Sequence, residues 1–376
     1  MKLTNLILST FLIALCSCKT TDTRVETRSS TPKNVILLIG DGTGLSQISS
    51  AFFFKETAPN YGRFKHIGLI NTSSSREDVT DSAAGATAFA SGVKTYNGAI
   101  GVADDSTEVE TIIEIVSPKN IKSGVISTSS IVHATPASFY AHALNRGFYE
   151  EIAADLAVSN IDFFAGGGTK FFNKRKDGRD LFKELRAKQF NIDTTALGIF
   201  NSIKSYTKAA YLFGPEHMPP TAQGRGDYLP KATELGIQFL SKDNSNFFLM
   251  VEGSQVDWGG HGNDSDYLIS ELIDFDNAIG KALDFAKRDG NTLVIVTADH
   301  ETGGFTLAAS KKIDAEGKEY SDYSETEGIF STGGHSATLI PVFAYGPGAE
   351  EFSGVYENNE IFQKIAVIRS YLNHKA

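Results

Sequence analysis

Carboxylate and imidazole side chains gather directly after apolar runs in this sequence. Three such runs are followed or ended by residues that can bind a metal, namely Asp41, Glu252 and the pair Asp299-His300. Two glycine-rich stretches supply three more: Asp257, His261 and His335. Aspartate and histidine in such places make a site for a hard or borderline metal ion. Alone, Asp41 in the turn 40–44 would be interpreted as a helix N-cap, but the cluster as a whole predicts a site for several metal ions.

Ser82 is the candidate nucleophile, because it lies where a helix of small residues is expected to begin. The run 80–88 has the sequence TDSAAGATA. Free N–H groups and the helix dipole favour an anion at such a terminus, so a serine there can hold a phosphoryl group. Plain N-capping by Asp81 or Ser82 is the alternative. No neighbouring histidine supplies the base of a hydrolase triad, which points to activation by a metal.

The elements that must position these residues alternate between strands and helices. Buried strands are indicated by apolar runs at 34–39, 123–127, 247–251, 292–297 and 340–345. Helical patterns lie at 111–116, 149–158, 180–188, 231–240 and 267–287. This alternation predicts an α/β fold with a mostly parallel sheet. In such sheets ligands bind at the carboxyl ends of the strands, where the candidate residues would converge.

Length and charge restrict the classes of function. The chain has 376 residues and a formal charge of −10. A nucleic-acid-binding module is not expected, since phosphate backbones favour a basic surface. An anionic substrate would have to be attracted locally, by metal ions or a placed arginine.

The N-terminus is interpreted as an export signal. Residues 1–17 combine a short positive region with an apolar stretch too short to span a bilayer. The sequence Leu15-Cys16-Ser17-Cys18 resembles a bacterial lipobox, which predicts a lipid on Cys18 and a place in the periplasm or outer membrane. An ordinary cleaved signal peptide is the alternative. The chain has no other cysteine than Cys16 and Cys18, so no disulfide is expected in the mature domain.

The rest of the chain is expected to form one domain. Polar residues 18–32 predict a flexible tether, and residues 33–376 predict a single domain. The least regular stretch, at about 166–228, is expected to be an excursion from the sheet.

Several motifs resemble one enzyme family. The run 79–88, continuing through 92–98, closely resembles the nucleophile segment of the zinc-dependent bacterial alkaline phosphatases. The segments 297–301 and 334–336 are similar to the later metal motifs of that family, in the same order along the chain. The resemblance implies a large central sheet flanked by helices on both faces, and usually a homodimer. It also implies hydrolysis of phosphate monoesters through a phosphoserine, with two Zn²⁺ ions and a third metal.

The resemblance also assigns roles to individual residues. The ligands of the first zinc would be Asp257, His261 and His335. Those of the second would be Asp41, Asp299 and His300, which Ser82 can join. The third site, usually Mg²⁺, would be formed by Asp41, Thr135 and Glu252. Arg146 would grip two phosphate oxygens, a task that suits the planar guanidinium.

Two positions depart from the best-known bacterial pattern. His133 stands where that pattern has an aspartate, and Trp258 stands where it has a lysine. Direct ligation by His133 would favour Zn²⁺ or Co²⁺ at the third site, and a hydrogen bond to the ligands is the alternative role. Trp258 removes a cation near the phosphate, which predicts weaker phosphate binding and faster release.

The four remaining histidines are given no ligand role: His66, His142, His217 and His374.

Three other functions compete with this interpretation. A phosphodiesterase of the same superfamily often uses threonine as nucleophile and lacks a counterpart of Arg146. A sulfatase would need a Cys/Ser-x-Pro-x-Arg segment, which the chain lacks. A non-catalytic phosphate-binding lipoprotein would show a damaged nucleophile or a missing ligand, and neither is seen.

Overall fold

The computed structural model describes residues 31–365 of the chain. The predicted signal peptide, Cys18, most of the predicted tether and His374 lie outside these residues. Within residues 31–365, no helix combines the length and the apolar character needed to cross a bilayer.

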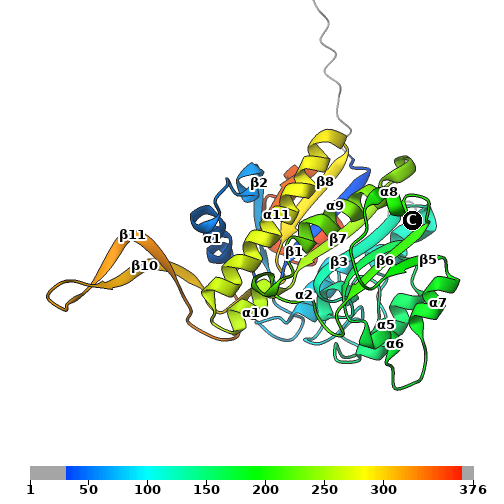
Figure 1. The fold of residues 1–376 in the computed structure, drawn as a ribbon, viewed down its shortest axis with the longest axis horizontal. Coiled ribbons are helices and arrows are strands. Elements are labelled where there is room, and N and C mark those ends of the chain that lie inside the picture. Colours follow the sequence, from blue (N-terminus) through cyan, green and yellow to red (C-terminus); the bar gives the residue numbers. More distant parts are fainter. Residues whose placement is uncertain (1–30, 366–376) are drawn as a thin grey trace, which may run out of the picture.

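A ten-stranded sheet forms the centre of the fold, in the order β14-β2-β13-β8-β1-β7-β3-β4-β6-β5 (Figure 1). All neighbouring strands pair in parallel except β13, which is antiparallel to both β2 and β8. The α/β fold with a mostly parallel central sheet is therefore confirmed. The strands of this sheet are β1 (Asn34–Gly40), β2 (His66–Asn71), β3 (Lys122–Ser130), β4 (Phe163–Gly167), β5 (Phe190–Asp193), β6 (Lys208–Phe213), β7 (Phe247–Gly253), β8 (Thr292–Thr297), β13 (Ile340–Tyr345) and β14 (Gly354–Glu357).

Two small antiparallel pairs lie outside the large sheet. One pairs β9 (Glu301–Thr302) with β12 (His335–Ser336), and this pairing sets His335 opposite Thr302. The other is a hairpin of β10 (Thr306–Ile313) and β11 (Glu319–Ile329), which projects away from the body of the protein (Figure 1).

Helices cover both faces of the sheet. The α-helices are α1 (Leu45–Phe54), α2 (Ser82–Ser91), α3 (Ile112–Val116), α4 (Ala134–Ala137), α5 (Tyr149–Val158), α6 (Lys170–Asn173), α7 (Leu181–Ala187), α8 (Phe200–Ile203), α9 (Tyr228–Leu240), α10 (Gln255–His261), α11 (Ser265–Asp289) and α12 (Glu360–Lys364). Short 3₁₀ helices lie at η1 (Asn60–Arg63), η2 (Ser117–Lys119), η3 (Thr221–Gln223), η4 (Lys242–Asn244) and η5 (Ala349–Phe352).

The central strand β1 shows why the sheet needs helices on both sides. All its residues are buried, and its side chains alternate between two hydrophobic cores. Val35, Leu37 and Ile39 pack into the core that includes residues of α2, α4, α5 and α7. Ile36 and Leu38 pack into the opposite core, beneath α9 and α11. The continuous apolar run in the sequence thus reflects burial on both faces.

Residues 166–228, predicted to be an excursion, extend the edge of the sheet. β6 pairs with β4, and β5 pairs with β6, both in parallel. β5 has only four residues and three of them are half-buried, so it lacks the long apolar run that marked the central strands. The segment therefore widens the sheet beyond β4.

Candidate active site

The predicted site residues converge at the carboxyl ends of the central strands. Asp41 follows β1, Glu252 lies near the end of β7, and Asp299 comes two residues after β8. Gly42 makes this convergence possible: its φ is +72°, and a β-carbon there would lie 2.6 Å from Cα of Asp257. Three segments from distant parts of the sequence thereby reach one point of the sheet edge.

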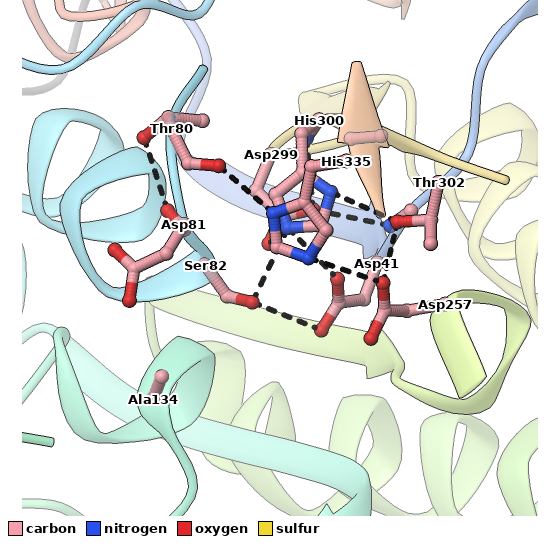
Figure 2. A network of polar contacts seen from close by, with 12 residues as sticks. Asp41, Thr80, Asp81, Ser82, Ala134, Asp257, Asp299, His300, Thr302 and His335 are labelled. Carbon is pink, nitrogen blue, oxygen red and sulfur yellow. Dashed lines mark hydrogen bonds and ion pairs between the residues drawn. The ribbon is translucent and has the colours of Figure 1, made fainter. Parts of the chain in front are cut away.

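Ser82 is the first residue of α2 and lies beside this point (Figure 2). Asp81 caps the helix, since its Oδ1 accepts the N–H of Ala84 at 3.0 Å. Geometry explains why α2 has a glycine at position 85, because a β-carbon there would lie 3.0 Å from Cβ of Asp299. The helix can therefore lie close enough to bring Ser82 to the carboxylates.

His261 and His335 direct their Nε2 atoms at each other. Nδ1 of His261 faces the carbonyl oxygen of Gly333 at 2.8 Å, and Nδ1 of His335 faces that of Thr80 at 2.9 Å. Because a carbonyl can only accept, each Nδ1 donates its proton, which leaves each Nε2 available to offer a lone pair to a cation. The two Nε2 atoms are 3.2 Å apart, and Oδ1 of Asp257 lies 3.4 and 3.6 Å from them. Three electron-pair donors facing one another form a cation site.

The second group consists of fully buried residues around His300. Its Nε2 lies 3.5 Å from Oδ1 of Asp41, 3.4 Å from Oδ2 of Asp299 and 3.3 Å from Oγ of Ser82. Oδ1 of Asp41 and Oδ2 of Asp299 have no hydrogen-bond partner although both are buried. Buried carboxylate oxygens without a partner are costly unless a cation binds them.

Thr302 connects these two groups, and the sequence analysis gave it no role. Its hydroxyl donates to Oδ1 of Asp257, and its oxygen lies 3.2 Å from Nδ1 of His300 (Figure 2). Since the single hydroxyl proton goes to Asp257, the oxygen must accept the proton of His300 Nδ1. This fixes the tautomer of His300 and leaves its Nε2 lone pair directed at Asp41 and Asp299. The only sequence signal was its position two residues after His300.

The third group brings together Asp41, His133 and Glu252. Their ligand atoms lie within 4.8 Å of one another. Glu252 is held by Ser127, whose hydroxyl donates to Oε2 at 2.7 Å, while Oε1 has no partner. His133 Nδ1 and the hydroxyl of Thr135 are likewise buried without partners. His133 is therefore one of the three residues in this group, and Thr135 lies close enough to Glu252 to lower its pKa.

The rings of Trp258 and His217 pack beside His133 of the third group. The ring of Trp258 lies 6.2 Å from that of His133 and 4.8 Å from that of His217, both in edge-on arrangements. His217 accepts the N–H of Ser130 at its Nδ1, at 3.0 Å. His217, which the sequence left without a role, thus packs against the site but is not a member of the three candidate metal groups.

The site concentrates negative charge away from water. Burial, together with Asp299, Asp257 and Glu252, raises the pKa of Asp41 well above its usual value. Burial also raises the pKa of Asp299, and that of Glu252 to about 7. Burial lowers the pKa of His300 to about 3, with His335 acting in the same direction. Neutral imidazoles beside crowded carboxylates are the electrostatic signature of a site built for divalent cations.

Arg146 is oriented by the residue that caps the nucleophile helix. Its Nη1 donates to Oδ2 of Asp81 at 2.9 Å. Burial alone would raise the pKa of Asp81, but Arg146 and the N–H of Ala84 outweigh it and leave that pKa lowered. Asp81 therefore fixes both the start of α2, as the sequence suggested, and the guanidinium, which the sequence did not reveal.

Comparison with known proteins agrees with this geometry. The sequence model of the family described as alkaline phosphatase matches residues 32–329 and 308–371. Alkaline phosphatase 3 of Bacillus subtilis (strain 168) is 34% identical over 89% of this chain and 88% of its own length. Alkaline phosphatase of Escherichia coli (strain K12) is 31% identical over 88% of this chain and 84% of its own.

Among solved structures, the alkaline phosphatase from the Antarctic bacterium TAB5 is 66% identical. It superposes with a TM-score of 0.88 over 90% of this chain and 98% of its own. A variant of that protein has been solved with Mg bound in a site called M3. The chain belongs to the alkaline phosphatase family, and it is an enzyme that hydrolyses phosphate monoesters at a metal site.

Proposed function

We propose that this alkaline phosphatase acts through a phosphoserine on Ser82, with two Zn²⁺ ions and a third divalent metal. The observation that carries the proposal is the convergence of three imidazole Nε2 lone pairs, from His261, His335 and His300, on buried carboxylates next to the Ser82 hydroxyl. This donor set fits zinc, which prefers nitrogen and carboxylate ligands in a compact arrangement.

The residues that would hold the metals fall into the three groups described. Asp257, His261 and His335 would hold one Zn²⁺, and Asp41, Asp299 and His300 would hold the other. When bound, these cations supply the positive charge that lowers the pKa of the Ser82 hydroxyl and stabilises the departing oxygen.

The third metal is proposed to be Mg²⁺ in a site of mixed ligands. The oxygens of Asp41, Thr135 and Glu252 suit Mg²⁺. His133 adds a nitrogen to the same group, which supports Zn²⁺ or Co²⁺ as the competing occupants. The TAB5 structures with Mg in the M3 site are variants in which a histidine is replaced by Asp or Glu, whereas this chain keeps His133 in its third group, and direct metal analysis decides the question.

The chain's own side chains carry out the rest of the reaction. Arg146 binds two oxygens of the phosphoryl group, and the N-terminus of α2 adds its N–H groups. Ser82 Oγ, having lost its proton, forms a bond to phosphorus while the bond from phosphorus to the ester oxygen breaks. The alcohol leaves with a proton from solvent. The oxygen of a water molecule then bonds to phosphorus while the bond from phosphorus to Ser82 Oγ breaks. A proton of that water restores the Ser82 hydroxyl, and inorganic phosphate leaves.

The cellular setting is a proposal that rests on the sequence. A signal peptide at 1–17 and a lipid on Cys18 would place the enzyme in the periplasm or outer membrane. Mass spectrometry of the mature N-terminus tests both, because a lipidated Cys18 and a plain cleaved end differ in mass.

A homodimer is also proposed. Its support is the exposed apolar surface of α1, where Leu45, Phe52 and Phe53 are each more than half exposed. Light scattering of the full 376-residue chain should give a mass of twice 40.6 kDa, and a single-chain mass would contradict the proposal.

A metal-restoration experiment tests the proposed function. The enzyme is dialysed against a chelator, and Zn²⁺ and then Mg²⁺ are returned while monoester and diester hydrolysis are measured. We expect monoesterase activity to return with Zn²⁺ and to rise with Mg²⁺. Dominant diesterase activity would favour the phosphodiesterase alternative, and no hydrolysis with full metal content would favour the phosphate-binding alternative.

A further inference from the structure

His142, which the sequence left without a role, lies between two acceptors. Its Nδ1 is 2.6 Å from the carbonyl oxygen of Gly101, and its Nε2 is 3.0 Å from Oε1 of Glu114. A carbonyl and an ionised carboxylate can only accept, so both ring nitrogens must donate. An imidazole that donates from both nitrogens is a cation. The side chain of His142 is only 15% exposed, so this charge is held mainly by its protein partners.

Acidic groups face this imidazolium from three elements. Glu114 comes from α3, where its Oε2 also accepts the N–H of Thr111 in a capping box. Asp155 comes from α5, and its Oδ2 accepts the main-chain N–H of His142 at 3.1 Å. Glu108, in the loop before α3, adds further negative charge. The hydrogen bond to Glu114 is the main cause that raises the pKa of His142 to about 9, while burial opposes the rise.

The segment that begins at His142 leads directly to Arg146. It is paired with the segment 98–101: Ile100 and Ala143 exchange two main-chain hydrogen bonds of 2.9 and 2.8 Å. At the far end of the pair, the N–H of Arg146 donates to the carbonyl of Gly98 at 2.8 Å. His142 closes the near end through its hydrogen bond to Gly101. The two segments are therefore fastened at both ends, by His142 at one and by Arg146 at the other.

The same pair of segments also reaches the nucleophile helix. The N–H of Gly98 donates to Oδ1 of Asp81 at 3.0 Å, and Arg146 donates to Oδ2 of the same carboxylate. Thr87 of α2 donates to the carbonyl of Ala99 and accepts the N–H of Gly101. A shift of the 142–146 segment would thus move the guanidinium relative to Ser82.

We propose that the His142–Glu114 ion pair is a positioning device for Arg146. The imidazolium fastens segment 142–146 to segment 98–101, and this holds the guanidinium where it meets the phosphoryl group. The inference rests on the proposed role of Arg146 in binding phosphate. His142 touches neither substrate nor metal in this account, and its effect passes through the main chain.

Competitive inhibition by inorganic phosphate tests the proposal. Glu114→Gln keeps an acceptor for Thr111 and removes the charge that holds the imidazolium, and His142→Gln removes the cation itself. At about pH 8 we expect both variants to raise the phosphate inhibition constant by about five- to ten-fold, which corresponds to about 1–1.4 kcal/mol. Above about pH 10 the wild-type imidazole is neutral as well, so the ratio of variant to wild type should fall towards one.

Three controls separate positioning from general destabilisation. Metal content should stay at the wild-type level in both variants. Ile152→Val removes one methyl group from the hydrophobic core beside α5 and leaves the ion pair and Asp155 unchanged, so it should lower stability without changing phosphate inhibition. An equal effect of Ile152→Val, an unchanged inhibition constant in both ion-pair variants, or a ratio independent of pH would overturn the proposal.

If Arg146→Ala weakens phosphate binding and the ion-pair variants do not, only this inference fails. If Arg146→Ala leaves the phosphate inhibition constant unchanged, the proposed role of Arg146 in binding phosphate is itself wrong.

Discussion

Replacing Thr302 by valine should weaken both of the metal groups that flank Ser82. The hydroxyl serves Asp257 and His300 at once. Valine matches threonine in shape but leaves Asp257 without a donor and the Nδ1–H of His300 buried without an acceptor. Each loss costs about 1–3 kcal/mol in a buried site, and loss of such outer partners typically lowers metal affinity about 10–100-fold.

The assay is a zinc titration of the metal-free enzyme against a competing chelator, followed by kcat at saturating Zn²⁺. Thr302→Ser is the matched control, because it keeps the hydroxyl and removes only a methyl group. We expect Thr302→Val to bind both ions about 10–100-fold more weakly and Thr302→Ser to stay within about three-fold of wild type. Zinc affinity of the valine variant equal to that of the serine variant would refute the bridging role of Thr302.

Three further predictions concern charge. The raised pKa of His142 stabilises the fold, by at most about 3 kcal/mol, and this contribution is fully present below about pH 6.5 and lost as pH rises through about 9. The free energies of unfolding in urea of the wild type and Glu114→Gln should therefore converge at high pH. Glu252, with its pKa raised to about 7, should make the metal-free enzyme less stable as pH rises from about 4.5 through 7. Thermal melting with and without Mg²⁺, in the presence of Zn²⁺, should show that metal at the third site reverses this loss. Trp258→Lys returns a cation beside the phosphate site, so the phosphate inhibition constant should fall about three- to ten-fold; an unchanged constant would remove the proposed effect of Trp258.

The central strands could be predicted because both of their faces are buried. The runs 292–297 and 340–345 coincide with β8 and β13, and the run 34–39 falls one residue short of β1. Strands towards the margin of the large sheet, and strands outside it, gave no such signal. β2 alternates between buried and half-buried residues and carries an exposed Ile67, and the β10–β11 hairpin is largely exposed. β2 pairs with β13 and β14, which come far later in the sequence, and local patterns do not record such pairing. The hairpin pairs locally, but its exposed and half-buried residues form no continuous apolar run.

The ligand-type residues could also be predicted, because strand ends in a parallel sheet share one edge. The structure brings Asp41, Asp299 and His300 together as expected. What the sequence could not show is how each ligand is held. The Nδ1 partners of His261 and His335 are main-chain carbonyls of Gly333 and Thr80, and carbonyls leave no trace in residue type.

The contact of Asp81 with Arg146 and that of His142 with Glu114 were hidden for a related reason. Asp81 meets Arg146 across 65 residues, and His142 meets Glu114 across 28. Both contacts arise only when the segments 98–101 and 142–146 pair beside α2. An aspartate before a helix and a histidine after an alanine are individually ordinary, so their function depends on the tertiary arrangement.

The central claim is that Ser82 carries the phosphoryl group, and acid trapping tests it most directly. The enzyme with its metals is mixed with a labelled phosphate monoester, quenched in acid, digested and analysed by mass spectrometry. The account predicts a phosphorylated peptide containing Ser82 in the wild type. In Ser82→Ala it predicts no label, full metal content and a loss of most of the turnover. Label on another residue, or turnover at the wild-type rate in Ser82→Ala, would contradict the account.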